Sequence, residues 1–270
     1  MIVSVILIYN SSVYAEVLSP EFHNPSGLKL FEYASIIVAI FLYLYFIRQS
    51  IRAGTLTFGL LLLISSNSMA WLDWSASWGA YILYNPKFTC LPWGSTLWTT
   101  PNKPYALIAL YGWYYMAVYM SLMALIKLFR AKFPNFSHTA SVLIVTIPIF
   151  YAWDLLLEAF AAQVGWWTYV VCVGPAIISS KGNWPIVYPI SVFVVYGVIA
   201  TWFLSNRGPD GRPKFESWFR VENIHNHAVR EIARLGVWLL VMNVLYVLFL
   251  IIPLVGSREL IVDIPSTLVP

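Results

Sequence analysis

Three carboxylates stand out because they lie in stretches of chain that are otherwise apolar enough to cross a bilayer. Asp73 lies in one stretch and Asp154 and Glu158 lie in another, and neither stretch contains a Lys or Arg. An ionisable group inside a bilayer is costly unless it is protonated, paired or facing a polar cavity. The three acids are therefore the candidate catalytic residues.

Their spacing indicates the chemistry they could perform. Asp154 and Glu158 are four residues apart, which places them on one face of a helix. Two neighbouring carboxylates in a low dielectric do not readily both ionise, so one of them should hold a proton at neutral pH. A protonated carboxyl beside a carboxylate is the arrangement that general acid–base catalysis needs. In the alternative interpretation each acid hydrogen-bonds a facing helix or lies at the headgroup boundary.

The composition indicates that the elements carrying these acids are membrane spans. Of the 270 residues, 60% are hydrophobic and only 10% are charged, and the mean hydropathy is +0.72. A soluble chain of this length has too small a core to bury so much apolar surface. The net charge of +4 comes from basic residues in the loops between apolar stretches, which reports topology and gives no indication of nucleic-acid binding.

Hydropathy predicts an all-α polytopic bundle, a single integral-membrane domain over residues 1–270 with about six spanning helices and aromatic-rich outer loops. The predicted spans are Leu28–Ile47, Leu56–Leu83, Tyr105–Leu128, Thr139–Gly165, Pro185–Asn206 and Ile232–Val255. Residues 1–27 are expected to form an N-terminal interfacial segment, with an uncleaved signal as the alternative. Residues 207–230 are expected to form a cytoplasmic loop.

The basic residues predict the orientation in a cytoplasmic (inner) membrane. Eleven fall on one side of the predicted spans and five on the other, which places both chain termini outside. The eleven are Arg48, Arg52, Lys127, Arg130, Lys132, Arg207, Arg212, Lys214, Arg220, Arg230 and Arg234. The five are Lys29, Lys87, Lys103, Lys181 and Arg258. All three acids then lie toward the outer half of the bilayer, and Cys90 and Cys172 lie on the outer side, where one disulfide could form.

Aromatic and amide residues near the acids are candidates for binding a substrate. Aromatic residues make up 17% of the chain, more than interfacial belts need, which favours an aromatic-lined pocket closed by two stiff outer loops rich in Pro, Gly and Trp. The alternative interpretation is that these residues anchor the chain at the membrane interface. The candidates are Trp71, Trp74, Tyr84, Asn85, Trp153, Trp167 and Tyr169.

No metal or cofactor is expected from the sequence. His23, His138, His225 and His227 all lie outside the predicted spans, and no carboxylate-plus-His pattern is present to hold iron, copper or zinc. The chain also lacks a Gly-rich phosphate loop and a Gly-x-Ser-x-Gly elbow. With these classes excluded, the sequence favours metal-free acid–base chemistry on a hydrophobic molecule.

Aromatic and turn residues form an ordered set of motifs around the acids. The motifs are Trp71-Leu72-Asp73-Trp74, Tyr84-Asn85-Pro86, Pro92-Trp93-Gly94-Ser95 and Trp98-Thr99-Thr100-Pro101, then Asp154, Glu158, Gly165, Tyr169 and Gly182-Asn183-Trp184-Pro185. Their order resembles the AveC family of integral-membrane spirocyclases. The similarity covers about Gly54 to Tyr246, and Trp74 stands where a Pro is expected after the Asp of the first motif. The resemblance implies dehydration and closure of a dihydroxy-ketone polyketide into a spiroketal.

The residues agree with that chemistry and leave alternatives open. In this interpretation Asp154 and Glu158 are acid and base, Asp73 is a stabiliser or second base, and Tyr84, Asn85 and Tyr169 orient the substrate. The same groups would serve carbocation cyclisation or hydration of an isoprenoid. A different class also remains: a non-catalytic subunit that binds partner membrane subunits, or a carrier for a lipid-like molecule.

Overall fold

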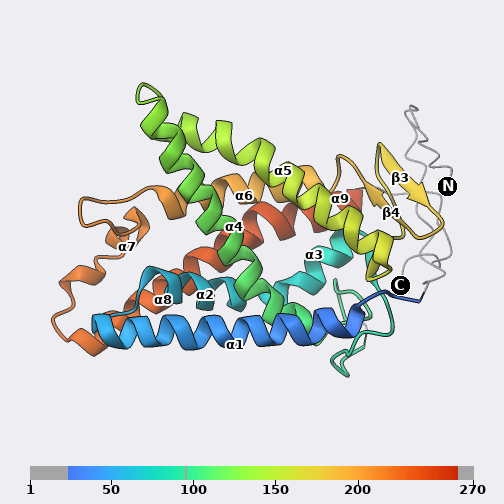
Figure 1. Ribbon diagram of the computed structural model, residues 1–270, viewed down its shortest axis with the longest axis horizontal. Coiled ribbons are helices and arrows are strands. Elements are labelled where there is room, and N and C mark those ends of the chain that lie inside the picture. The colour runs from blue at the N-terminus through green and yellow to red at the C-terminus, as the bar shows by residue number, and fades with distance from the viewer. Residues whose placement is uncertain (1–23, 95, 261–270) are drawn as a thin grey trace.

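The computed structural model describes residues 24–94 and 96–260, and most of these are helical (Figure 1). The predicted N-terminal interfacial or signal segment therefore lies almost wholly outside the described residues. The helices are α1 Leu28–Ala53, α2 Phe58–Ser68, η1 Met69–Leu72, α3 Asp73–Gly79, α4 Tyr105–Lys132, α5 His138–Val164, α6 Ile190–Ser205, α7 Lys214–Trp218, η2 Val221–Asn223, α8 His227–Tyr246, η3 Val247–Ile251 and α9 Ile252–Leu260. The strands are β1 Ile82–Tyr84, β2 Trp167–Tyr169, β3 Ala176–Ser179 and β4 Gly182–Pro185.

Four helical segments in the described part of the chain are long and apolar enough to cross a membrane, whereas the sequence predicts six. They are α1, α4, α5 and the continuous run from α8 through η3 to α9. α1 extends along the long axis of the molecule, whereas α4 crosses it steeply (Figure 1). The run changes to a π-helix over η3. Pro253 follows this π-helix. A proline has no amide hydrogen to donate to the carbonyl four residues before it, and its ring clashes with that carbonyl, so regular α-helix geometry is disturbed there.

The predicted span from Leu56 to Leu83 is divided into α2, η1 and α3. α2 has only 11 residues, about half of what a span needs. It ends in a polar run where the Ser65 and Ser68 hydroxyls donate to the carbonyls of Leu62 and Ser65, at 3.2 and 2.7 Å. Such bonds from Ser to the backbone compete with regular helix geometry, and the chain continues as a 3₁₀ turn.

The predicted span from Pro185 to Asn206 is also shorter than expected. α6 has 16 residues and begins after Pro189. Prolines at 185 and 189 remove the amide donors that an earlier start would require, and Pro185 is the last residue of β4. Part of the chain predicted as outer loops is thus strand: β1 pairs with β2, and β3 pairs with β4, both antiparallel.

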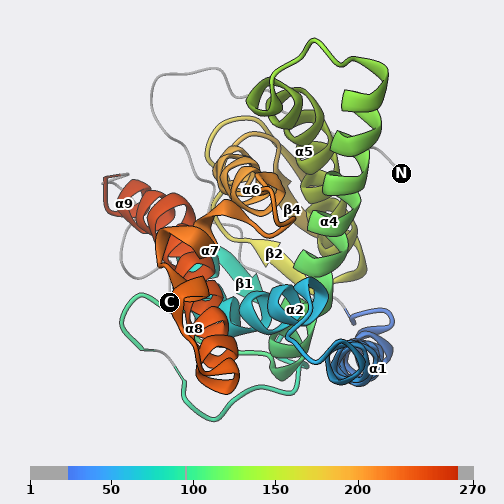
Figure 2. The ribbon, with the colours of Figure 1, turned by 90° about the vertical axis from the view of Figure 1, so that its left-hand side faces the viewer.

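Two shorter helices, α2 and α6, pack against the long ones. Viewed along the long axis, α2 lies beside α4, and α6 lies beside α5 (Figure 2). At the contact between α5 and α6, a Cβ added to Gly197 would lie 2.5 Å from the Phe150 ring. The absence of a side chain at Gly197 therefore permits the close approach of these two helices.

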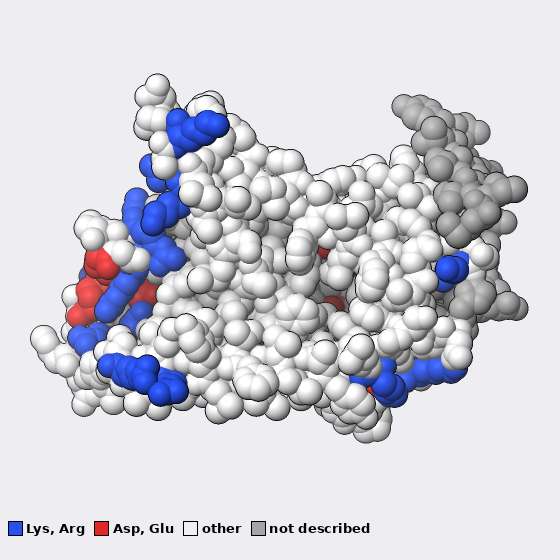
Figure 3. Space-filling model, viewed as in Figure 1, with Lys and Arg blue, Asp and Glu red and all other residues white. Residues whose placement is uncertain are grey.

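Basic residues gather at one end of the molecule. On the face shown in Figure 3, most Lys and Arg atoms lie at the end that holds α7, fewer lie at the strand end, and the band between them is almost uncharged. We call the end that holds α7 the basic end.

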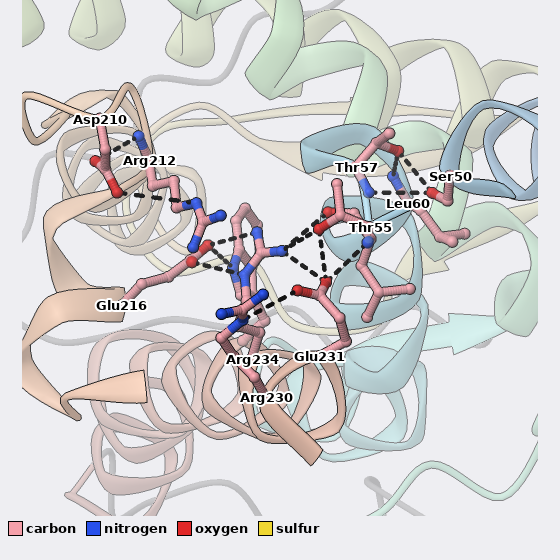
Figure 4. A network of polar contacts seen from close by, with 12 residues as sticks. Ser50, Thr55, Thr57, Leu60, Asp210, Arg212, Glu216, Arg230, Glu231 and Arg234 are labelled. Carbon is pink, nitrogen blue, oxygen red and sulfur yellow. Dashed lines mark hydrogen bonds and ion pairs between the residues drawn. The ribbon is translucent and has the colours of Figure 1, made fainter. Parts of the chain in front are cut away.

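A buried ion cluster secures this end (Figure 4). Arg234 on α8 binds Glu216 of α7 at 2.9 Å and Glu231 at 2.7 Å. Glu231 also accepts hydrogen bonds from Thr55 and from the Leu56 amide, at 2.9 and 2.8 Å. The cluster joins α7 and the connection between α1 and α2 to α8.

Candidate acid–base site

The three acids that the sequence singled out line one cavity, although they come from two elements far apart in sequence. Asp73 begins α3, and Asp154 and Glu158 lie one turn apart on α5. Their exposed fractions are 8%, 4% and 6%. Figure 3 shows acidic atoms at the bottom of a hollow in the middle of the uncharged band. The other lining residues are Ser77, Ile82, Tyr84, Leu107, Leu110, Tyr111, Tyr114, Tyr115, Phe150, Leu157, Trp167 and Phe193.

Asp73 is held by hydroxyl donors. Tyr111 donates to Oδ1 at 2.6 Å, and Tyr84 donates to Oδ2 at 2.8 Å. The Ser77 hydroxyl lies 2.7 Å from the Tyr84 hydroxyl and 3.5 Å from Oδ2. Donors on both oxygens are the arrangement that suits a charged carboxylate.

A second layer lies behind this carboxylate. The Tyr111 hydroxyl is 2.5 Å from the hydroxyl of Tyr246, the last residue of α8 before the π-helix. The rings of Tyr115 and Tyr196 pack edge-on against Tyr246, with centroids 6.3 and 5.0 Å away. Tyr246 is fully buried, so its hydroxyl needs a partner inside the protein, and Tyr111 supplies it.

The pair on α5 has a different environment. Trp167 donates its indole N–H to Glu158 Oε2 at 2.7 Å, and the phenol of Tyr169 lies close to Glu158. Asp154 Oδ2 is buried and has no hydrogen-bond partner among the described residues. No Lys or Arg lines the cavity. The two acids therefore face each other's charge with neutral groups around them.

The strand pair β1–β2 carries neutral donors to both carboxylate groups. Its register places Tyr84 opposite Trp167 and Ile82 opposite Tyr169, so one ladder joins the chain after α3 to the chain after α5. Burial, and secondarily the nearby Asp73 charge, raises the pKa of Tyr84 well above its usual range. Burial and the charges of Glu158 and Asp154 do the same to the pKa of Tyr169. Both phenols thus keep their protons at neutral pH.

The structure separates the predicted substrate-binding residues into two groups. Tyr84 and Trp167 line the cavity, whereas the other five predicted residues do not. Asn85 is buried and donates to the Gly165 carbonyl at 2.7 Å, which ties the loop after β1 to the end of α5. Tyr169 lies beside the cavity, as described above.

The remaining three are tryptophans. Trp74 is buried and packs edge-on against Trp93, with ring centroids 5.5 Å apart. Trp71 is 61% exposed and donates to Asn243 at 3.2 Å. Trp71 thus faces outward, as an anchor at an interface would. Trp153 on α5 is 49% exposed, and its ring centroid lies 6.4 Å from that of Tyr114, which lines the cavity.

Sequence reasoning missed the face of α4 that lines the cavity. Tyr111, Tyr114 and Tyr115 have the spacing that places side chains on one side of a helix. That spacing was available in the sequence. Tyr246 carries no comparable signal, because it is one of 17 tyrosines and lies in an apolar run.

Two further predictions concern metals and thiols. In residues 24–94 and 96–260, no three His, Cys, Asp or Glu side chains are grouped so that they could hold a metal ion. Cys90 and Cys172 are free thiols. The disulfide that the sequence allowed is therefore not formed.

Comparisons with known proteins identify one family. A family described as Spirocyclase AveC-like matches residues 55–260, which includes every residue that lines the cavity. Searches of curated proteins and of solved structures gave no match.

Proposed function

Because the chain belongs to the AveC-like spirocyclase family, we propose that it is an acid–base cyclase acting within the membrane. Its substrate would be a hydrophobic, oxygenated molecule of the polyketide or isoprenoid type, which it closes into a spiroketal or dehydrates. The observation that carries this proposal is the convergence of three buried carboxyl groups on one cavity whose other walls are aromatic and aliphatic.

The environments of the acids support separate roles for them. A spiroketal forms when a hemiketal hydroxyl is protonated and leaves as water, an oxocarbenium ion forms, and a second hydroxyl attacks and loses its proton. Asp154 is the candidate proton donor, because its Oδ2 has no donor partner in the described structure. Glu158, one turn away, is the candidate base that takes the proton from the attacking hydroxyl.

Asp73 is the candidate stabiliser of the cationic intermediate. Its two phenol donors suit a carboxylate that stays charged, and a fixed negative charge lowers the energy of a developing cation in a dry site. The aromatic rings of Tyr114, Tyr115 and Trp167 would add cation–π attraction to an oxocarbenium ion that lies over their faces. The proton that Asp154 gives leaves in the water, and Glu158 receives a different proton from the attacking hydroxyl. Transfer of that proton from Glu158 to Asp154 restores both groups, so the net reaction releases one water.

The orientation remains part of the proposal. We place the protein in the inner membrane with its basic end on the cytoplasmic side, because basic residues favour that side. The chain termini and the strand pairs would then lie outside. Tagging each end and testing its protection from protease in sealed vesicles would check this placement.

The test of the function is turnover by purified protein in liposomes. A lipophilic dihydroxy-ketone and an epoxidised prenyl compound are the two probes, because they separate spiroketal formation from carbocation cyclisation. We expect Asp154→Asn combined with Glu158→Gln to lower the rate by about 10² to 10⁴, the usual contribution of a general acid or base.

A matched control removes a buried carboxylate elsewhere. Glu32 on α1 is 5% exposed and binds Lys29 and the Thr89 amide outside the cavity, so Glu32→Gln should retain turnover once its folded fraction is measured. Unchanged turnover in the folded double variant would contradict the proposal. Absence of turnover of both probes by the wild type would also contradict it and favour a subunit or carrier.

A further inference from the structure

The cavity between the acids is much smaller than a lipophilic substrate. Its volume is about 60 Å³, whereas pockets that enclose drug-sized ligands have about 300–1,000 Å³. It therefore has room for a reacting group and a few atoms around it. A long molecule that reaches the acids must extend beyond the cavity.

The direction of that extension is visible on the surface. In Figure 1, α4 and α5 diverge from their connection at the basic end, and the hollow of Figure 3 lies in the gap between them, seen from the same side. The lining agrees, because α4 and α5 contribute nine of the fifteen lining residues. The hollow opens sideways, in the uncharged band midway along two candidate membrane spans.

The rim of the hollow is aromatic and apolar. Tyr114 of α4 and Trp153 of α5 reach toward each other across the gap, with ring centroids 6.4 Å apart. Beside them Phe160 of α5 is 54% exposed, on the same side of the helix as Trp153. Apolar side chains so exposed on a candidate membrane span form the kind of surface that contacts lipid. The rim therefore joins the acid cavity to the lipid and not to water.

We propose that the gap between α4 and α5 is a lateral binding cleft for a long-chain amphiphile whose oxygen-bearing end enters between the carboxyl groups while its apolar chain stays in the lipid. The identity of the reaction rests on the proposed function; the cleft itself does not. Trp153, which lies outside the cavity, becomes a rim residue that the chain passes.

The cleft determines which part of a ligand is recognised. Groups at the oxygenated end meet fixed phenols, carboxyls and the indole of Trp167, whereas the far chain meets mobile lipid. Binding should therefore respond strongly to added bulk near the oxygens and weakly to the length of the apolar chain.

Neighbouring leucines on α5 supply a matched pair of variants. Leu157 lines the cavity, and Leu156 is mostly exposed on the lipid side. Leu157→Trp adds a ring inside the cleft, and Leu156→Trp adds the same ring one position away, toward lipid. Both proteins would be reconstituted in phosphatidylcholine liposomes after their monodispersity and thermal melting have been checked.

The probe is a long-chain alcohol that carries a photoactivated diazirine beside its hydroxyl group. Illumination should attach it to cavity residues such as Glu158 and Leu107, identified by peptide mass spectrometry. We expect attachment to fall by about tenfold in Leu157→Trp, the equivalent of about 1.4 kcal/mol of crowding, and to remain near the wild-type level in Leu156→Trp. The isomer with its diazirine at the methyl end should label the rim and lipid instead.

The outcomes separate the cleft from the reaction. Equal cavity labelling in the two folded variants, or labelling of the cavity by the methyl-end isomer as strongly as by the hydroxyl-end isomer, would overturn the cleft. Labelling that follows the prediction in a protein that turns over neither cyclase probe would support the cleft and contradict the proposed function. Turnover of a cyclase probe without the predicted labelling would support the proposed function and contradict the cleft.

Discussion

Two groups of buried carboxylates in this protein have opposite surroundings. At the basic end Glu216 and Glu231 each bind Arg234 at 2.9 and 2.7 Å. In the middle of the molecule Asp73, Asp154 and Glu158 have neutral hydroxyls, an indole and each other. The two groups are buried to a similar extent. The difference lies in whether a cation compensates the charge.

A paired cluster and an unpaired one have different reasons to exist. The cluster at the basic end connects three segments of the chain, so its function in the fold is evident from its contacts. In the cavity Asp73 and Glu158 have neutral donors only, and Asp154 Oδ2 has no partner among the described residues. Because a buried ionisable group without a cation is costly, its presence in the cavity is explained better by chemistry than by stability.

The largest expected effect comes from removing the cation of the paired cluster. Arg234→Leu leaves Glu216 and Glu231 buried without their counter-charge, which should lower the free energy of unfolding by about 3–5 kcal/mol. Unfolding in detergent micelles, followed by circular dichroism, measures this. Arg230→Leu is the control, because Arg230 is partly exposed and lies 3.9 Å from Glu231; it should cost about 1 kcal/mol or less. Equal losses would show that the cluster is not the source.

Next in size is the effect of the second layer behind Asp73. In Tyr246→Phe the Tyr111 hydroxyl loses its neighbour at 2.5 Å, so Tyr111 and Asp73 are less firmly positioned. We expect kcat to fall by about tenfold, about 1.4 kcal/mol, with KM little changed and the pH profile of kcat displaced.

Tyr196→Phe is the matched control for that change. Tyr196 is equally buried, its ring packs on Tyr246, and its hydroxyl donates to the Met69 sulfur at 3.2 Å, away from Asp73. It should lower kcat by about twofold at most, about 0.4 kcal/mol, because its hydroxyl holds no residue that contacts Asp73. Similar losses in both variants, or an unchanged pH profile in Tyr246→Phe, would reduce Tyr246 to a packing residue.

These second-layer residues also mark the limit of what the sequence could predict. Asp73, Asp154 and Glu158 were identified because a charge in an apolar run is rare, and the structure places all three at one cavity. Tyr246 contacts a residue 135 positions away, and no local pattern predicts such a contact. Aromatic residues are so common in this chain that residue type alone could not separate Trp167, which lines the cavity, from Trp71, which faces outward.

The sequence likewise predicts the long helices of the fold but not the breaks between the shorter ones. α1, α4, α5 and the run from α8 to α9 follow from hydropathy, because continuous apolar length is what a span requires. The break after α2 depends on serine hydroxyls that bond to the backbone, and the late start of α6 depends on two prolines. Windows of average hydropathy merge both features into the surrounding apolar sequence, so six spans were predicted where four are found among the described residues.

A smaller effect should distinguish the unpaired acids by its sign. Asp154→Asn keeps the shape of the side chain and removes a buried ionisable group that has no cation beside it. We expect the free energy of unfolding to stay the same or rise by about 1 kcal/mol, because sites kept for chemistry are often less stable than their neutral variants. Glu216→Gln, which removes one partner of Arg234, should instead be destabilising. Destabilisation by Asp154→Asn comparable to that of Glu216→Gln would mean that Asp154 has a structural partner and would end the contrast between the two groups.

The smallest effect is absent at neutral pH and concerns the neutral donors around the unpaired acids. In the folded protein the pKa of Tyr169 is raised well above the ordinary value of a tyrosine, about 10, first by burial and then by the Glu158 and Asp154 charges. Its unfolded form therefore loses a proton first, and the stability linked to it is complete below about pH 10 and is lost as pH rises from there toward the folded pKa. Above pH 10 the wild-type unfolding free energy should fall more steeply than that of Tyr169→Phe, by up to about 1.4 kcal/mol per pH unit. Tyr45→Phe removes an exposed phenol of α1 and should keep the wild-type slope. If Tyr169→Phe kept it as well, Tyr169 would not be a buried neutral donor beside Glu158, and the acid pair on α5 would be less isolated from water than its burial indicates.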